Sequence, residues 1–271
     1  MLGMGIFHSL LTDRAVLRIS GHDRIDFLQN LVTQNVAQPP SGSCVMAALL
    51  TPQGKLLYDF FIFVEDDSFL LDCDSDSAAA LMKKLNLYKL RAAVTIAETD
   101  LTMHALWQAD GLPSPPQAGF YEDPRAEGLG LRGFFETAPD TKLPVKPLDE
   151  WHMNRLKLGV PQGPLEMPPG TVFPLEYGMA ERHTIDFQKG CFVGQEVTSR
   201  THRKGRLRKK LHAITLAAAD GQQGDALMAG DRIGGELVAR RAQCGLALIR
   251  EDAVAEKLTL NGAAVEISAP Q

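Results

Sequence analysis

The residues with the greatest capacity for chemistry lie around two glycines, Gly190 and Gly194, in the segment 189–196, which reads Lys-Gly-Cys-Phe-Val-Gly-Gln-Glu. Glycine permits backbone conformations and close approaches that a Cβ atom forbids, so this loop can present Cys191 to a ligand or to another chain. Gln195 begins a stretch that can start a helix, and a thiol near a helix N-terminus and among cations has a lowered pKa. Cys191 is therefore a candidate nucleophile or metal ligand.

Two other interpretations of Cys191 stay open at this level. A cysteine is often a small buried apolar residue without a chemical role. Cys191 could also pair with His183 or His202 as a nucleophile and its general base, although a sequence does not establish contact. Three further cysteines form no Cys-x-x-Cys or Cys/His pattern, which predicts free thiols and no intrinsic structural zinc site: Cys44, Cys73 and Cys244.

A strongly basic run follows the loop. Between residues 196 and 210 seven Arg and Lys side chains accompany one acid, a local net charge of +6; because the whole chain carries −5, the remainder carries −11. The acidic remainder argues against nucleic-acid binding over the whole surface. The run itself could bind phosphate backbones, hold a polyanion such as a polyglutamate tail, or form a solvated face. It lacks the interleaved aromatic residues of a single-strand-binding surface.

Composition places the chain among ordinary soluble proteins. It has 271 residues, of which 45% are hydrophobic and 23% charged, enough for two or three packed modules. The first residues show no charged and apolar pattern of a secretory signal, and no apolar run approaches the roughly 20 residues of a membrane span. The sequence therefore predicts a cytoplasmic protein with no membrane partner.

The chain before residue 145 mixes helix and strand signals. Apolar residues recur at helical spacing in two segments, 25–33 and 78–85, and the second follows acidic and serine residues that can cap a helix. Four apolar segments bounded by turn residues predict strands: 14–19, 44–50, 55–64 and 92–97. Together these elements make an α+β block.

The second half of the chain changes character twice. A helix is predicted over 148–158, ended by Gly159. The long segment 160–177 then reads as an ordered loop, held to the core by its apolar residues. Beyond Lys210, short apolar runs separated by glycine-containing turns predict a small β-barrel or sandwich. The boundary before this module falls near Arg206.

The loop also resembles a known signature. The segment 189–196 is similar to the pattern K-G-C-[YF]-x-G-Q-E of the YgfZ family of folate-binding proteins, relatives of the glycine-cleavage T-protein that assist iron–sulfur protein maturation. The similarity continues through 200–202, as in the mitochondrial branch of that family. It spans nearly the whole chain, because it is also found in the segments 27–29, 33–35, 51–55, 88–91, 155–161 and 174–176.

This resemblance implies a three-part, ring-like α+β fold around a central folate pocket. The parts would be a discontinuous folate-binding α+β domain (1–50 and 145–205), a ferredoxin-like α+β domain (51–144) and a C-terminal β-barrel (206–271). A pterin needs a carboxylate or amide partner, and the glutamate tail of folate needs cations. The resemblance makes Cys191 the functional thiol and names these folate-binding candidates: Thr33, Asn35, Arg155, Glu176, Lys189, Gly190, Gly194, Gln195, Glu196 and Arg200.

The function implied is that of a tetrahydrofolate-binding accessory factor for the assembly or repair of [4Fe–4S] proteins, with those assembly or client proteins as partners. Cys191 would transiently ligate iron or a cluster, or resolve an oxidised intermediate. One cysteine supplies one ligand, so a stable cluster would need a partner chain, glutathione or a second protomer.

Two alternatives belong to other functional classes. The first is a folate-dependent aminomethyl or one-carbon transferase. T-proteins carry an aspartate where Ala80 or Leu81 stands here, and tend to have an acid at the place of Lys157, so this chain departs from the enzymatic pattern twice. The second is an RNA-binding module that uses the basic run, which predicts binding with a steep salt dependence.

Overall fold

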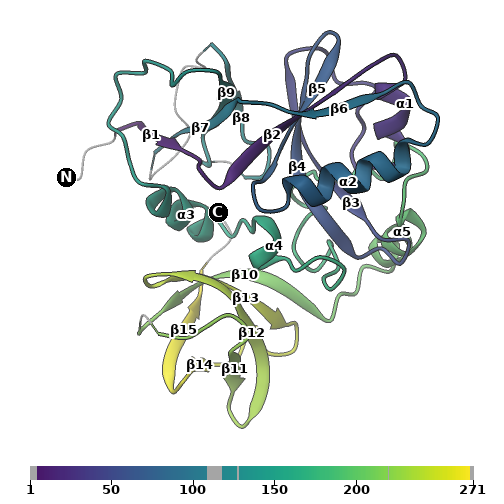
Figure 1. The fold of residues 1–271 in the computed structure, drawn as a ribbon. Helices are drawn as coiled ribbons and strands as arrows, with labels where there is room; N and C mark the ends of the chain where they lie inside the picture. The colour runs from purple at the N-terminus through teal and green to yellow at the C-terminus, as the bar shows by residue number, and fades with distance from the viewer. Residues whose placement is uncertain (1–4, 109–117, 127, 219, 269–271) are drawn as a thin grey trace.

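The computed structural model describes residues 5–108, 118–126, 128–218 and 220–268. Its largest sheet has five strands in the order β3-β4-β5-β2-β6, with every neighbouring pair antiparallel (Figure 1). The strands of this sheet are β2 (Arg14–Ser20), β3 (Ser43–Leu50), β4 (Leu56–Val64), β5 (Ser68–Asp74) and β6 (Thr95–Glu98). They form the centre on which the other elements pack.

Strand β4 explains why this sheet is covered on both faces. Its sequence, LLYDFFIFV, is an apolar run interrupted by Asp59. Successive side chains of a strand point to opposite faces. Phe60 and Ile62 accordingly join one apolar cluster, whereas Phe61 and Phe63 join another. A strand with apolar residues on both faces is stable only between two covering layers.

Two helices provide the first layer. They are α1 (Arg24–Gln29) and α2 (Ala78–Lys89), and Figure 1 shows α2 crossing the face of the sheet. Leu81 and Leu85 are fully buried against Phe60 and Ile62. Their spacing of four residues puts both on one side of the helix, which is the pattern that predicted it.

A four-stranded antiparallel sheet and a helix provide the second layer. The order of strands is β1-β7-β9-β8. The elements are β1 (Phe7–Leu10), β7 (Thr102–Trp107), β8 (Phe120–Glu122), β9 (Leu131–Phe135) and α3 (Leu148–Lys157). Trp107 of β7 and the fully buried Trp151 of α3 pack in one cluster with Phe61 and Phe63.

Buried charges join the two sheets. Arg14 Nε donates to Asp72 Oδ1 at 2.6 Å, and Arg132 Nη1 contacts the second oxygen of the same carboxylate. The Arg132 guanidinium also lies 3.3 Å from Asp123, whose oxygens accept bonds of 3.0 and 2.8 Å from Arg125. All five side chains are buried. Buried charges are tolerated only when paired, so this chain of ion pairs fixes how the sheets meet.

The C-terminal strands close into a barrel in the order β10-β13-β12-β11-β14-β15. They are β10 (Lys209–Leu216), β11 (Ala226–Ala229), β12 (Arg232–Arg241), β13 (Cys244–Arg250), β14 (Leu258–Leu260) and β15 (Ala263–Ile267). Leu237 and Ile249 fill the interior. Val238, Leu246 and Leu248 point outward and pack against the ends of β3 and β4, which attaches the barrel to the body.

Two short helices complete the fold. Figure 1 shows α4 (Gly163–Glu166) between the five-stranded sheet and the barrel, and α5 (Gln195–Lys204) beside the end of β3. The predicted α+β class with a C-terminal barrel is confirmed. The predicted division at residue 50 is not matched by a break in the sheet, because β3 and β4 pair along their whole length across it. The domain limits stay a prediction.

Candidate functional site

In the loop 189–195 the apolar side chains point into the protein, whereas the Cys191 side chain points into solvent. Phe192 is buried in the apolar cluster between the sheet and the barrel. Val193 packs against the cluster beneath α1 and α2. Cys191 is exposed. The apolar neighbours therefore anchor the loop and leave the thiol in solvent.

Lys189 anchors the start of this loop. Its Nζ donates to the backbone oxygens of Gln29, Val32 and Gln34 at 2.6, 2.5 and 2.9 Å. An ammonium group has three donors, so all of them are used. Burial lowers the pKa of Lys189 to about 8, and the nearby Asp186 carboxylate opposes this shift. The group is still mostly protonated at pH 7.

Thr33 and Asn35 lie next to the residues that lead into the loop. Thr33 Oγ1 donates to the Thr184 oxygen at 2.7 Å and accepts from the Ala48 amide at 2.9 Å. The Thr33 oxygen accepts from the Asp186 amide at 3.0 Å. The Asn35 carboxamide accepts a bond from the amide two residues further on. Thr33 thus holds backbone groups of the segment that leads into the Cys191 loop, whereas the Asn35 side chain bonds within its own segment.

The two glycines of the loop are needed for different reasons. Gly190 has a φ of +96°, and a Cβ there would meet nothing within 4 Å, so its backbone conformation alone favours glycine. Gly194 has a φ of +83°, and a Cβ there would also lie 2.6 Å from the Thr51 oxygen in the β3–β4 turn. Gln195 Nε2 donates to the Gly190 oxygen at 2.6 Å and closes the loop.

Cys191 differs from the other three cysteines in its exposure. All four are free thiols. Burial raises the pKa of Cys73 to about 12 and raises that of Cys44 well above its usual value, which disfavours their thiolates. Cys244 is half-buried. In the described part of the chain no three His, Cys, Asp or Glu side chains gather into a metal site.

The alternative in which Cys191 pairs with His183 or His202 is not formed among the described residues. His202 instead stacks on Phe187, with ring centroids 3.9 Å apart and an interplanar angle of 11°. Within the described residues neither His202 nor His183 hydrogen-bonds to the thiol. A nucleophile and its base need to be within hydrogen-bond reach, and in the described part of the chain neither of these two histidines meets that condition.

A groove of about 460 Å³ runs along α5, lined by Phe187, Gln195, Glu196, Ser199, His202 and Arg203. It adjoins the Cys191 loop, because Gln195 is bonded to the residue before the cysteine. Arg200 lies 3.9 Å from Glu196 in an exposed pair, which contributes little stability. The exposed cations beyond it are Arg203, Lys204, Arg206 and Arg208. The predicted basic run is thus a solvent-facing surface beside the thiol.

Two other predicted residues lie away from the loop. Arg155 is buried and donates to the two oxygens of Glu166 at 2.8 and 2.5 Å and to His152 Nδ1 at 2.9 Å. This guanidinium holds α4 to α3. Glu176 lies 3.8 Å from Lys209 of the barrel. Burial raises the pKa of Glu176, and Lys209 opposes that shift.

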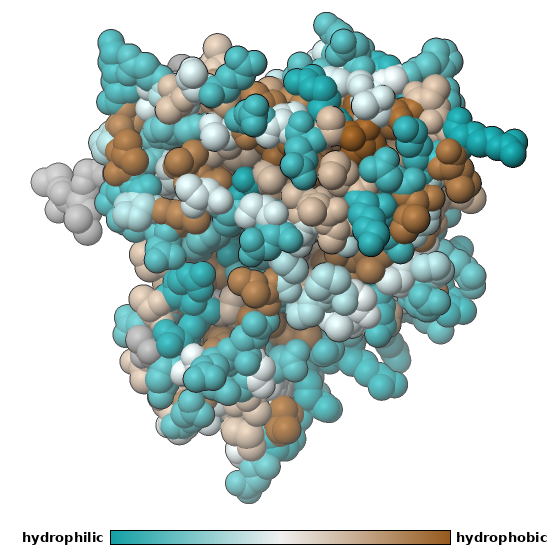
Figure 2. Space-filling view, in the orientation of Figure 1, coloured by the Kyte–Doolittle hydropathy of each residue, from teal (hydrophilic) through white to brown (hydrophobic). Residues whose placement is uncertain are grey.

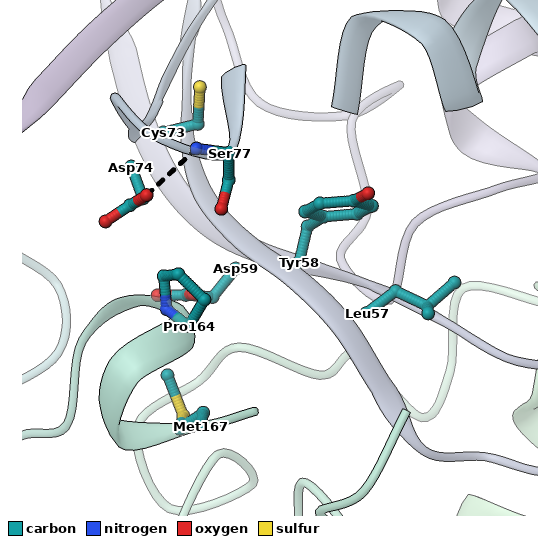
Figure 3. A pocket seen from close by; sticks show the side chains of 8 residues that line it. All are labelled: Leu57, Tyr58, Asp59, Cys73, Asp74, Ser77, Pro164 and Met167. Atoms are coloured by element: carbon teal, nitrogen blue, oxygen red, sulfur yellow. Dashed lines mark hydrogen bonds between the residues drawn. The ribbon is translucent and has the colours of Figure 1, made fainter. Parts of the chain in front are cut away.

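A separate small pocket lies between β4, β5 and α4, lined by Leu57, Tyr58, Asp59, Cys73, Asp74, Ser77, Pro164 and Met167 (Figure 3). Its space of about 10 Å³ is the room of one water molecule. Asp74 accepts a bond from the Ser77 amide at 3.0 Å, and burial raises the pKa of Asp59. Sequence reasoning missed Asp59, although a lone acid inside an apolar strand was a signal.

Comparisons with known proteins agree with this architecture. Residues 208–271 match the family described as CAF17, C-terminal beta-barrel domain. The fold is similar to the crystal structure of the glycine cleavage system aminomethyltransferase T from Bartonella henselae, with a TM-score of 0.77 over 98% of this chain and 86% of that chain. The sequence identity of that pair is 13%, so the similarity concerns the fold alone.

Similar sequences cover much of the chain. The iron–sulfur cluster assembly factor IBA57, mitochondrial, of Mus musculus is 31% identical over 90% of this chain and 77% of that protein. The Homo sapiens protein of the same name is 33% identical over 75% of this chain and 65% of that protein. The Neurospora crassa homolog is 33% identical over 74% of this chain. The chain spans about half, 52%, of that homolog's length.

These names correct the predicted cytoplasmic location, because the relatives are mitochondrial proteins. The prediction depended on the lack of secretory and membrane signals. A protein of the mitochondrial interior lacks these signals just as a cytoplasmic protein does, so their absence does not distinguish the two locations. No helix in the described ranges is long and apolar enough to cross a membrane. The resemblance to the mitochondrial branch of the T-protein-like proteins is confirmed, and the chain belongs to the family of the iron–sulfur cluster assembly factor IBA57.

Proposed function

We propose that this chain is an accessory factor in iron–sulfur cluster assembly and that Cys191 is the thiol through which it acts. Its membership of the IBA57 family supports the first part. The observation that carries the second is local: Cys191 is exposed on a loop whose neighbouring side chains are all anchored. A loop fixed in this way presents the sulfur in one place at little cost in conformational entropy.

The chemistry proposed for the thiol is ligation of iron in a cluster that is cargo. On ligation the thiol loses its proton and the sulfur binds iron. One sulfur is one ligand, so the other ligands come from a partner chain or a small thiol. A partner that reaches Cys191 would also cover the adjoining groove with its exposed Arg203, and the exposed Lys204 beside it. Charge complementarity therefore favours a partner with an acidic face.

Tetrahydrofolate stays a prediction of the resemblance, and no step of this proposal depends on it. The predicted contacts do not line one cavity: Arg155 is bonded to Glu166, and Glu176 lies beside the barrel. The pocket at Asp59 offers about 10 Å³, whereas a folate-sized ligand needs several hundred. Binding in that pocket would require α4 to move away from β4, whereas the groove along α5, lined by the predicted residues Gln195 and Glu196, already has about 460 Å³. Calorimetric titration with tetrahydrofolate tests this, and turnover with an amine donor tests the transferase alternative.

The proposal is tested by complementation of cells that lack this protein, with the activity of a [4Fe–4S] enzyme as the readout. We expect Cys191→Ala to restore little activity, at most about a tenth of that restored by the wild type. Cys244→Ala is the matched control and should restore it fully, because that thiol is half-buried on the barrel. Circular dichroism and protein levels establish that both variants are folded.

Full complementation by Cys191→Ala would overturn the role of the thiol. The assembly role itself would be overturned if the wild-type protein did not restore the activity of the [4Fe–4S] enzyme. An enzyme without a cluster serves as the control, and its activity should not change when the protein is lost. The two outcomes are distinct, because the first concerns one sulfur and the second concerns the whole chain.

A further inference from the structure

The position of Lys189 supports an inference about how the thiol is presented. We propose that Lys189 is a positioning residue, whose ammonium group holds the Cys191 loop against the turn formed by residues 29–34, and that it is not a ligand contact. This deepens the proposed function, because it concerns the same thiol. Its test needs no cluster and no partner, so the two proposals can fail separately.

Three backbone oxygens converge on the Lys189 ammonium group. Helix α1 ends at Gln29, and the carbonyls at a helix C-terminus lack helical partners. The oxygens of Gln29, Val32 and Gln34 all lie within 2.9 Å of Lys189 Nζ. Three oxygens that share one small volume repel each other unless a cation lies among them. The turn therefore takes its shape from a residue that is 155 or more positions away in the chain.

The side chains of Lys189 and Cys191 point in different directions. Lys189 points into the protein and Cys191 points into solvent, and Gly190 between them has a φ of +96°, a conformation that favours glycine. Fixing the ammonium group therefore fixes where the sulfur emerges. Phe192 supports the same position, since its ring centroid lies 5.5 Å from Nζ.

The Lys189 ammonium group has no donor left for a ligand. Every N–H of the ammonium group already donates to a carbonyl. A carboxylate of a ligand could bind Lys189 only if at least one of these bonds broke. The remaining contacts between the same segments, from Thr33 to Thr184 and Asp186 and from Gln34 to His183, would then have to hold the loop.

The test compares Lys189→Ala and Lys189→Met by hydrogen exchange of the amides in residues 29–36 and 183–195. The Met variant keeps a chain of similar length without the charge, and the Ala variant leaves a channel that n-propylammonium fits. We expect at least tenfold faster exchange in both segments for both variants, with the barrel strands unchanged. Lys83→Ala, an exposed residue of α2, is the control.

Chemical rescue separates the ammonium group from simple packing. In Lys189→Ala, n-propylammonium should slow the exchange again, whereas n-propanol, which fills space without charge, and tetramethylammonium, which cannot donate, should not. Alkylation of Cys191, measured relative to Cys244 by peptide mass spectrometry, should return to the wild-type ratio with the same amine.

Wild-type exchange in Lys189→Met would overturn the proposal, as would equal rescue by n-propanol. If Lys189→Ala does not fold, its refolding is measured in n-propylammonium. Recovery of the folded state supports the proposal. The proposal is contradicted if no additive restores folding and Lys189→Met folds with wild-type exchange rates.

Discussion

At the scale of single residues, the residues around Cys191 stabilise the loop in different ways. Lys189 supplies a cation to three carbonyls, and Phe192 supplies apolar surface to the cluster between sheet and barrel. Gly190 supplies a backbone conformation that other residues rarely adopt. Gly194 combines such a conformation with contact against the β3–β4 turn. The thiol is left as the residue with no structural task.

Replacing Gly194 by Ala tests this distinction. The new Cβ would lie 2.6 Å from the Thr51 oxygen, so the loop must move away from the turn. We expect a loss of about 3 kcal/mol or more in the free energy of unfolding, from overpacking added to the strain of a positive φ. Gly205→Ala is the matched control: its φ is +64° with nothing within 4 Å, so the expected loss is about 1–2 kcal/mol. Equal losses in urea denaturation would contradict the close approach.

At the scale of elements, two histidines join β1 to β7. His8 Nε2 lies 2.8 Å from His104 Nδ1, and Thr102 Oγ1 lies 3.0 Å from both His104 Nε2 and the Phe135 oxygen. The hydroxyl hydrogen must go to the carbonyl, so His104 Nε2 donates to Thr102 and its Nδ1 accepts from His8. The His104 ring is therefore neutral, and burial lowers the pKa of His8 as well. Burial lowers the pKa of His104 to about 4, helped by the neighbouring His8.

This pair predicts a pH dependence of stability. Between pH 6.5 and about 4 the unfolded chain binds a proton that His104 in the folded protein does not, so stability falls as the pH is lowered through this range. The loss should be on the order of 3 kcal/mol. His104→Phe should flatten the dependence, whereas His22→Gln, at an exposed position, should keep it. Parallel curves of unfolding free energy against pH for His104→Phe and the wild type would contradict the assignment.

At the scale of the whole molecule, the charge is divided between a basic surface and an acidic remainder. The run 196–210 carries +6 in a chain of −5. Figure 2 shows mainly hydrophilic side chains over the edge where α5 lies. Arg203, Lys204, Arg206 and Arg208 are exposed there, next to the loop of Cys191. Such an arrangement attracts anionic groups toward the thiol over a Debye length of about 10 Å at 0.1 M salt.

Thiol reagents of different charge measure this field without a partner protein. An anionic aromatic disulfide should react with Cys191 several-fold faster, relative to a neutral disulfide, in the wild type than in the double variant Arg203→Gln, Lys204→Gln. The ratio should fall as salt is raised. Lys83→Gln with Lys84→Gln on α2 is the control of equal charge change. A ratio that does not respond to salt or to the α5 variant would show that the basic surface does not act on the thiol.

Much of the fold could be predicted from local sequence patterns. The helices bury one side and the strands bury one or both faces, and this burial gives a regular spacing of apolar residues in the sequence. The spacing of Leu81 and Leu85 predicted α2, and the apolar runs after Lys210 predicted most of the barrel. The four-residue strand β11 was missed, because so short a segment carries little periodicity. The helix predicted over 25–33 ends at Gln29, because the Thr33 amide donates to Ala48 of β3 and the Gln29 oxygen accepts from the distant Lys189.

For the candidate site, the sequence by itself determined which residue types lie together in the segment 189–196 and, through resemblance, the family and its cysteine. Only the tertiary structure decided which of the predicted residues share a place. Thr33 and Lys189 meet at the loop, whereas Arg155 serves α4 and Glu176 faces the barrel. The physical reason is that burial and hydrogen-bond partners depend on contacts between distant segments. The local sequence determines neither the burial of a side chain nor its hydrogen-bond partners. Only the folded structure therefore shows that Lys189 is anchored while Cys191, two positions away, is exposed.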